Sequence, residues 1–380
     1  MVPGLRAQRF SYAVGAPWHD GCVTSHRIPA LVFAAAAFLT LAAPGPYLLE
    51  SAGPAVDVHG SYQDKQLVTI KGADTYPSDS HLFMTTVTQW GTPQVGVTGA
   101  QTVAALFSKD LQMMPVRSVY APAQTLESAQ KQDAAMMDSS QNAAAVVALQ
   151  KAGYKVTMTL TVAADHGDFR KGDVIKSLTI NGTTTPITTF SDLSSKLFAT
   201  NAGTKVDVGV TRDGKSVDIA ATTVAYEADS TGWVHPGSRL GVALIDSDLK
   251  FPVDVTYDVQ GIGGPSAGTM FTLGIYDSLT KGSLAGSATL AGTGTMSYNG
   301  DVGAIGGIQH KLVGAYGKGA RNFLAPAENC AETVGYTPAG MKVWSIRTID
   351  DALAAARAIG EGKEPDLPQC SEVAQQAAQQ

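Results

Sequence analysis

Ser266 and Lys311 are the two residues whose types and surroundings suit nucleophilic chemistry on a carbonyl. Ser266 lies in the Gly-rich turn of residues 261–268, which separates an apolar strand from the helical run 269–279. A serine hydroxyl needs a base, and a neutral lysine can be that base. Lys311 lies among apolar residues, and burial lowers a lysine pKa because desolvation disfavours the charged form. The pair predicts a Ser-Lys dyad; a capping serine and a surface lysine are the ordinary alternatives.

The turn around Ser266 also predicts a place for a negatively charged oxygen. The first N–H groups of a helix point at whatever approaches its start, and such donors stabilise the oxyanion that forms when a carbonyl is attacked. We expect the backbone from Gly264 to Ala267 to provide them, although Pro265 has no N–H. The pattern is not G-x-S-x-G, because Pro265 directly precedes the serine.

Residues 293–311 add a second signature. Its motifs are Thr293-Gly294, Gly300-x-Val302 and Ile305-Gly-Gly-Ile-x-x-Lys311. Together with Gly-Pro-Ser266-Ala-Gly they strongly resemble the proteolytic domain of Lon-type Ser-Lys proteases, over residues 239–356. The resemblance implies that Ser266 is the nucleophile, Lys311 the general base and Thr293 the residue that helps to position the lysine. It also implies a serine endopeptidase that works through an acyl-enzyme and needs no cofactor.

Residues 153–226 have the pattern of a second, β-rich domain. Asn181-Gly182 and Asp213-Gly214 lie between β-type runs and are strong hairpin signals, and residues 189–199 predict a helix. The motifs are Lys171-Gly-Asp-Val-Ile175, Ile180-Asn-Gly182 and Arg212-Asp-Gly-Lys215. They resemble a PDZ domain of the bacterial protease type, and such domains bind extended peptides by adding a strand to a sheet edge. A β-rich spacer that binds nothing is the alternative.

One string, Gly209 to Ser216, matches the phosphate-loop pattern G-x-x-x-x-G-K-[ST]. It lies inside the second predicted hairpin, and residues 217–219 after it alternate like a strand. No helix N-terminus would therefore hold a phosphate there. We interpret the match as chance.

The region between residues 50 and 152 has a mixed pattern. Residues 66–70 and 82–87 predict strands, and residues 125–152 predict helix. Asp138 would cap a second helical piece within that stretch, and Gly153 would end it.

The first apolar run is residues 28–49, uncharged over 28–43. A bilayer span needs roughly 20 apolar residues, and this run reaches that length only if Pro44-Gly45-Pro46 is included. We favour an uncleaved transmembrane anchor. A secretory signal cleaved near residues 41–43 and a buried core helix are the alternatives.

Charges beside this run predict its orientation. Arg6, Arg9 and Arg27 precede it, while Glu50 and Asp57 follow it with no basic residue before Lys65. The positive-inside rule then predicts a single-pass protein of the cell membrane with a cytoplasmic N-terminus and an extracytoplasmic catalytic domain.

Cys330 and Cys370 would share that oxidising side, where a disulfide between them can persist. Two unpaired thiols are the alternative. Neither cysteine has a metal-ligand spacing with a histidine, so we expect no metal site.

Composition limits the remaining possibilities. The chain has 380 residues, 44% of them hydrophobic and 16% charged, so it can bury a core and is not disordered throughout. The net charge of −6 gives no sign of nucleic-acid binding. We predict an α+β protein with an N-terminal transmembrane helix, a PDZ-like β-rich domain and a Lon-type α/β proteolytic domain. The predicted parts are a cytoplasmic tail (1–27), the anchor (28–49), a strand and helix region (50–152), the PDZ-like domain (153–226), the proteolytic domain (236–358) and a poorly ordered polar tail (361–380).

This order resembles the membrane-anchored, PDZ-containing Lon-like proteases of Gram-positive bacteria, over residues 31–356. It lacks the ATPase module of ATP-dependent Lon, so we expect ATP-independent cleavage of unfolded or flexible protein segments, assisted by the PDZ-like domain. A homo-hexameric ring is implied by the resemblance alone. The alternatives are a non-catalytic, membrane-tethered PDZ adaptor that binds peptides, and a protein that cuts only its own chain.

Overall fold

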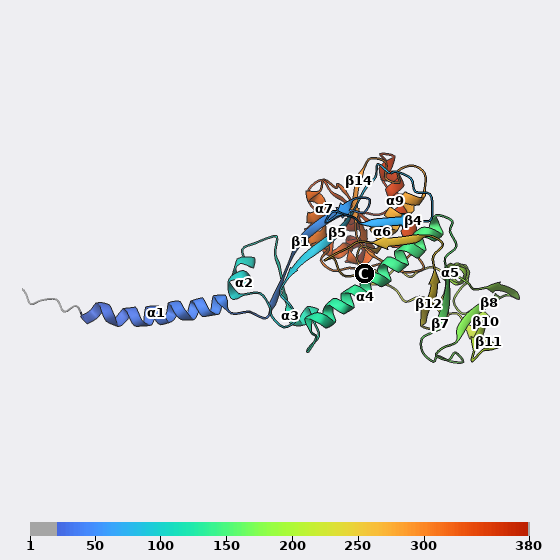
Figure 1. The fold of residues 1–380 in the computed structure, drawn as a ribbon, viewed down its shortest axis with the longest axis horizontal. Coiled ribbons are helices and arrows are strands. Elements are labelled where there is room, and N and C mark those ends of the chain that lie inside the picture. Colours follow the sequence, from blue (N-terminus) through green and yellow to red (C-terminus); the bar gives the residue numbers. More distant parts are fainter. Residues whose placement is uncertain (1–20, 379–380) are drawn as a thin grey trace, which may run out of the picture.

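A mixed six-stranded sheet supports the proposed catalytic residues. The computed structural model describes residues 21–378 (Figure 1). The strand order is β18 (Lys342–Ile346), β17 (Asn322–Pro326), β14 (Thr289–Gly292), β5 (His81–Trp90), β1 (Tyr47–Asp57) and β6 (Gln112–Pro115). Strands β18, β17, β14 and β5 run parallel, and β1 and β6 continue the sheet as antiparallel neighbours. The predicted strand at residues 82–87 is confirmed as part of β5.

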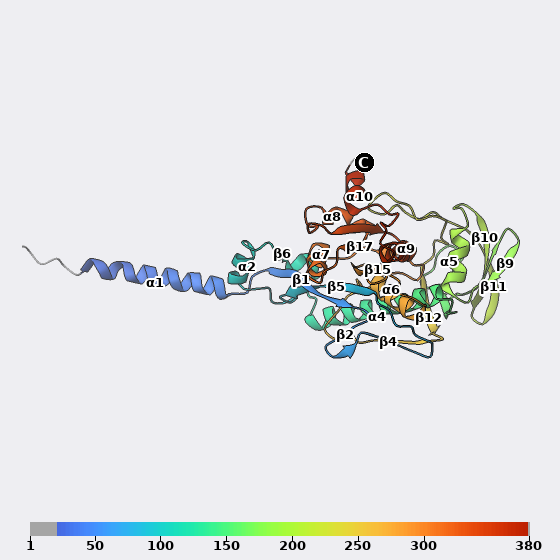
Figure 2. The same ribbon diagram turned by 90° about the horizontal axis from the view of Figure 1, so that it is seen from above.

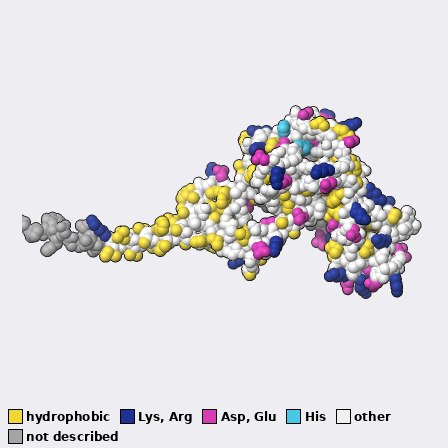
Figure 3. Space-filling model, in the orientation of Figure 1, with side chains coloured by type: hydrophobic (Ala, Val, Ile, Leu, Met, Phe, Trp, Pro, Cys, Tyr) yellow, Lys and Arg dark blue, Asp and Glu magenta, His cyan; other side chains and the backbone are white. Residues whose placement is uncertain are grey.

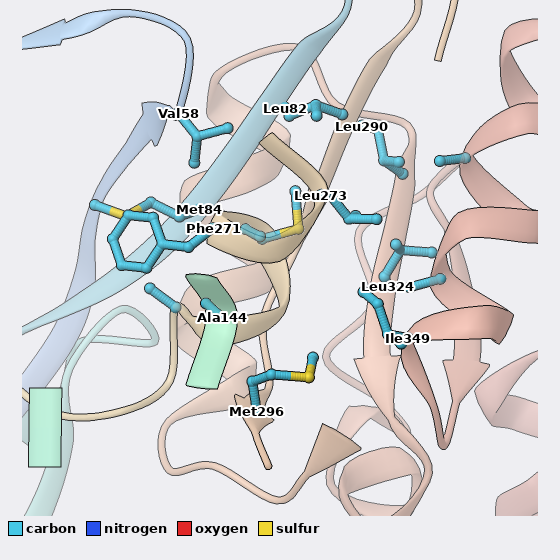
Figure 4. Packing of buried hydrophobic residues seen from close by; sticks show 14 of the residues in the cluster. Val58, Leu82, Met84, Ala144, Phe271, Leu273, Leu290, Met296, Leu324 and Ile349 are labelled. Atoms are coloured by element: carbon cyan, nitrogen blue, oxygen red, sulfur yellow. The ribbon is translucent and has the colours of Figure 1, made fainter. Parts of the chain in front are cut away.

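Alternating side chains give this sheet two apolar faces. Leu290 and Leu324 face a cluster formed with α4 (Leu126–Lys151), α6 (Gly268–Leu279) and α9 (Ile349–Gly360) (Figure 4). Their neighbours Ala291 and Phe323 face the other side, against α7 (Ile308–Gly317), α8 (Cys330–Thr333) and α10 (Cys370–Ala377). Figure 2 shows α8 and α10 on one side of the sheet and α4 and α6 on the other. Burial on both faces explains why these strands are continuously apolar.

A second sheet contains the PDZ-like residues. Its order is β11 (Lys215–Thr222), β10 (Lys205–Arg212), β8 (Val174–Ile180), β7 (Thr157–Val162) and β12 (Leu244–Lys250), with β9 (Thr183–Pro186) beside β8. Helix α5 (Phe190–Phe198) confirms the helix predicted over residues 189–199, and Thr189 is its N-cap. Both predicted hairpins are confirmed, since Asn181-Gly182 joins β8 to β9 and Asp213-Gly214 joins β10 to β11 with positive φ at all four residues.

The N-terminal helix α1 (Gly21–Ala42) overlaps the predicted anchor, and side chains such as Leu31 and Phe33 are exposed on it (Figure 3). Within residues 21–378 no helix combines the length and apolar character that a membrane crossing requires. The predictions of a transmembrane helix and of a single-pass cell-membrane location are therefore wrong, and the prediction of an extracytoplasmic catalytic domain, which rested on that helix, loses its basis. The apolar run needed Pro44-Gly45-Pro46 to reach its length, but the helix ends at Ala42 and β1 begins at Tyr47. Most of the predicted tail 1–27 lies outside the described residues.

Two smaller predictions are also wrong. Helix α4 is continuous, so Asp138 caps nothing; the sequence around it has no Gly or Pro to interrupt a helix. The tail 361–380, predicted to be poorly ordered apart from any bond at Cys370, contains the helix α10. This helix begins with a capping box between Gln369 and Glu372, buries Cys370 and Val373, and is tied to α8 by the disulfide at Cys370.

A disulfide between Cys330 and Cys370 fastens α10 to α8. Both residues are buried beside α7.

The bond closes a loop with a sequence separation of 40, so replacing both cysteines by alanine is expected to lower the free energy of unfolding by about 4 kcal/mol. Chemical denaturation of the oxidised proteins measures this. The double variant should show no response to a reducing agent, and equal stability of variant and wild type would contradict the prediction.

Candidate active site

The turn that carries Ser266 is held from two sides. It follows β13 (Asp254–Tyr257), which pairs with β4 (Val68–Lys71), and it runs directly into α6. Helix α4 lies beside it: Ser140 Oγ donates to the Pro265 carbonyl over 2.7 Å, and the Gly264 N–H points at the Asp133 carbonyl over 3.4 Å. The backbone of this turn is therefore fixed by a helix more than a hundred residues earlier in the chain.

Lys311 meets Ser266 inside this frame. Helix α7 places its Nζ 2.7 Å from Ser266 Oγ, 3.2 Å from Thr293 Oγ1 and 3.2 Å from the Thr85 carbonyl oxygen. Thr293 Oγ1 donates its own hydrogen to the Ser266 carbonyl over 3.0 Å. A neutral lysine can therefore donate its two hydrogens to Thr293 and Thr85, which leaves its lone pair facing the serine hydroxyl. This arrangement suits proton removal from Ser266.

The surroundings of Lys311 favour its neutral form. The residue is only 2% exposed, and burial lowers its pKa to about 8, while the negative charge of Glu50 opposes that shift. A substantial neutral fraction is thus present near physiological pH, as a lysine base requires.

Thr293 and Gly294 fix the carbonyl of the nucleophile. The Gly294 N–H donates to the Ser266 carbonyl over 2.9 Å, next to the bond from Thr293. Gly294 has φ +145, and an added Cβ would lie 2.5 Å from both Thr269 Oγ1 and Val302 Cγ1. The position therefore accepts only glycine without rearrangement.

The predicted oxyanion donors differ in their surroundings. Gly264 has φ +82, and its N–H is directed at Asp133 on α4. Ala267 directly follows the nucleophile and precedes the first residue of α6, where N–H groups lack an intrahelical acceptor. Of the two, Ala267 is better placed to bind an oxyanion.

A cavity of about 320 Å³ opens over the dyad. Its walls include Ser266, Lys311, residues 261–264, residues 85–89 and Met137. No histidine lies among these residues, which argues against a Ser-His scheme. The described part of the chain contains no cluster of three or more ligand-type side chains that could hold a metal ion. The Cys330–Cys370 disulfide lies apart from the cavity, in the cluster beneath α7.

Sequence reasoning missed three residues that surround the dyad: Thr85, Ser140 and Glu50. Thr85 acts through its backbone carbonyl, for which no sequence signal exists. Ser140 lies within an Ala-rich helix, and nothing in its local sequence indicates the contact with Pro265. The acidic residue Glu50 in an apolar strand was a usable signal, because a carboxylate that is buried needs a reason to be there.

Comparison with known proteins supports a protease domain around this site. Residues 257–358 match the Lon protease (S16) C-terminal proteolytic domain. This segment holds Ser266, Thr293 and Lys311. The match supports the Lon proteolytic domain family for this part of the chain, and it supports a serine peptidase.

Individual Lon proteases are also similar to this chain in sequence. The chain is 30% identical to Lon protease of Vibrio parahaemolyticus over 149 residues, which are 37% of this chain and 17% of the relative. It is 31% identical to Lon protease 2 of Bacillus subtilis over 108 residues, covering 28% of this chain and 18% of the relative. Lon protease of Fusobacterium nucleatum is 34% identical over 91 residues, or 23% of this chain and 12% of the relative. The matches thus span less than a fifth of the length of these relatives.

Gly294→Ala tests the packing behind the nucleophile. The added Cβ must displace Thr269 or Val302 and adopt an unfavourable φ, so we expect a loss of about 1–3 kcal/mol in stability. We also expect about 100-fold lower peptidase activity, because the Ser266 carbonyl would lose its position. The matched control is Gly306→Ala, where an added Cβ meets nothing within 4 Å. Thermal unfolding and peptidase assays compare the two, and equal behaviour would contradict the account.

Proposed function

We propose that this chain is an ATP-independent serine endopeptidase that uses a Ser266–Lys311 dyad to cleave unfolded or flexible protein segments. The observation that carries the proposal is the 2.7 Å contact between Lys311 Nζ and Ser266 Oγ at a buried position. The match of residues 257–358 to the Lon proteolytic domain supports the same assignment of residues.

The proposed reaction has two halves. Lys311 takes the hydroxyl proton while Ser266 Oγ forms a bond to the scissile carbonyl carbon. The negative oxygen is held by backbone N–H groups, with Ala267 the foremost candidate. The carbon–nitrogen bond then breaks, the amine leaves with the proton from Lys311, and an acyl-enzyme remains. Lys311 next takes a proton from water, whose oxygen bonds to the ester carbon. The carbon–Oγ bond then breaks, the acid product leaves, and Lys311 returns the proton to Ser266 Oγ.

An open strand edge supports an extended substrate. Strand β14 pairs with β5 only from His81 to Met84, whereas β1 pairs with the opposite edge of β5 as far as Trp90. Residues 85–89 therefore offer backbone donors and acceptors towards the cavity that they line. An extended segment can add to this edge with its scissile bond near Ser266. A folded domain cannot, so unfolded or flexible chains are the proposed substrates.

Two features support the proposed ATP independence. The first is that every group in the proposed steps comes from this chain and none of these steps uses a nucleotide. The second is that the phosphate-loop string lies across the β10–β11 hairpin, where Gly209 pairs with Asp218 and Arg212 with Lys215. A hairpin of this kind has no helix N-terminus to receive a phosphate.

We propose in addition that the sheet of the PDZ-like residues 153–226, which β12 extends, helps to bind substrate. Strand β12 pairs with the outer edge of β7, so that edge is already occupied. Among the described strands β12 is the last in this sheet, and its side chains are mostly exposed. The chain continues from β12 through β13 into the Ser266 turn. A peptide that extends the sheet at β12 would therefore lie beside the segment that leads to the nucleophile. A hexameric ring rests on family resemblance alone.

A peptide-binding adaptor without catalysis is the second candidate, because the β12 edge would serve it equally. The buried dyad argues against an adaptor. Burial of the lysine amine beside a serine costs free energy, and peptide binding alone does not need that arrangement.

The dyad variants decide between these functions. Ser266→Ala and Lys311→Ala should each reduce cleavage of an unfolded test protein by about 10⁴-fold or more, because the residues act as a unit. Added ATP should leave the cleavage rate of the wild type unchanged.

Exposed residues of the same types provide matched controls, Ser191→Ala and Lys318→Ala, which should retain full activity. Gel and mass analysis of the products measures cleavage, including any of the chain itself. Activity that survives in both dyad variants would rule out the proposal, and peptide binding without any hydrolysis would favour the adaptor.

A further inference from the structure

Glu50 is a buried acid behind the proposed base. It lies in the middle of β1, opposite Gln89 of β5 and Gln112 of β6, and is 7% exposed. Its Oε1 atom has no hydrogen-bond partner among the described residues. Folding has therefore removed a carboxylate oxygen from water without replacing its hydrogen bonds, which is costly unless a positive charge compensates.

The side chain of Glu50 reaches the start of the helix that carries Lys311. An ideal Cβ on Gly307, the N-cap of α7, would lie 2.0 Å from Glu50 Oε1. Gly307 has φ +68 and no side chain, and this leaves space for the carboxyl group. The position also suits a negative charge, because the N-terminus of a helix carries partial positive charge.

Lys311 is the charged group that compensates Glu50. The groups of α7 that titrate near it are Lys311 and His310, whose electrostatic partner is Asp110. The facing parts of β5 and β6, residues 83–90 and 112–115, contain no titratable side chain. Burial raises the pKa of Glu50, and the charge of Lys311 opposes that rise. Among the groups of these elements, Lys311 is therefore the one whose charge acts on Glu50.

We infer that Glu50 is a positioning residue that stabilises the ammonium form of Lys311, the form that exists after the lysine has taken the Ser266 proton. The inference rests on the proposed Ser-Lys mechanism. In that mechanism a neutral base becomes a cation inside a dry site, and a nearby fixed carboxylate lowers the free energy of that cation. Glu50 contacts neither substrate nor nucleophile and acts only through Lys311.

The test is Glu50→Gln, which keeps the shape and removes the charge. Without the carboxylate, the ammonium form is less favoured, so the pKa of Lys311 must fall below its value of about 8. The acid limb of the kcat/KM profile should move to lower pH by about one unit, since an opposite charge commonly shifts a pKa by about 1–3 units. The plateau of kcat should fall by about tenfold, because the charged intermediate is less stable. If Glu50 had only a structural role, its replacement by glutamine would not shift the acid limb of the kcat/KM profile.

Two further variants complete the experiment. Gln112→Ala changes the neighbour of Glu50 on β6 without changing charge, so its acid limb should coincide with that of the wild type. Glu50→Asp retains the charge but draws it back by one methylene group, so its limb should fall between wild type and Glu50→Gln. It also keeps the inference testable if Glu50→Gln does not fold.

A direct titration separates this inference from the proposed function. In protein labelled with ¹³C at lysine Cε, the signal of Lys311 is the one missing from Lys311→Arg, and its midpoint can be followed without substrate. A lower midpoint in Glu50→Gln than in the wild type is expected even if no substrate is cleaved, in which case only the protease assignment would fail. Equal midpoints in the two proteins would overturn the inference, whatever the activity.

Discussion

The structure of the site depends on one requirement: an amine must be able to lose its proton near physiological pH while it touches a serine hydroxyl. Water would keep a lysine charged, so the amine has to be buried. Burial then demands partners for its two hydrogens, and the structure provides the Thr85 carbonyl and the Thr293 hydroxyl. The lone pair is thereby directed at Ser266. Geometry and protonation state are thus set by the same contacts.

These contacts come from segments far apart in the chain. The sheet brings β5 beside β14, so that Thr85 on β5 and Thr293, directly after β14, both contact Lys311. Helix α4 holds the nucleophile turn from outside through Ser140. The same packing that builds the two apolar layers therefore builds the site. A substitution in the core between α4 and α6 should therefore displace Ser266, because densely packed interiors transmit small displacements.

The sequence contained enough to find the reacting groups but not the groups that support them. Ser266 and Lys311 lie in Gly-rich motifs. The glycines mark tight turns, because few other residues tolerate the backbone conformations of such turns. Thr85 contributes a backbone atom, which any residue would contribute, so no residue type indicates it. Local turn chemistry also predicted both hairpins of the PDZ-like sheet correctly. The membrane prediction failed because hydrophobicity along the sequence does not show where an element ends: the apolar run stops at Ala42, and helix α1 does not combine the length and the apolar character that a membrane crossing requires.

Capture of the acyl-enzyme is the decisive test of the Ser266–Lys311 dyad. A slowly deacylating activated ester of a short peptide can be mixed with the protein, and the site of any covalent adduct mapped by mass spectrometry. The Ser-Lys mechanism predicts one peptidyl adduct, on Ser266, that forms at least about 100-fold more slowly in Lys311→Ala, where the base is missing. Modification at another residue, or equally fast acylation of Ser266 without the lysine, would contradict the Ser-Lys mechanism.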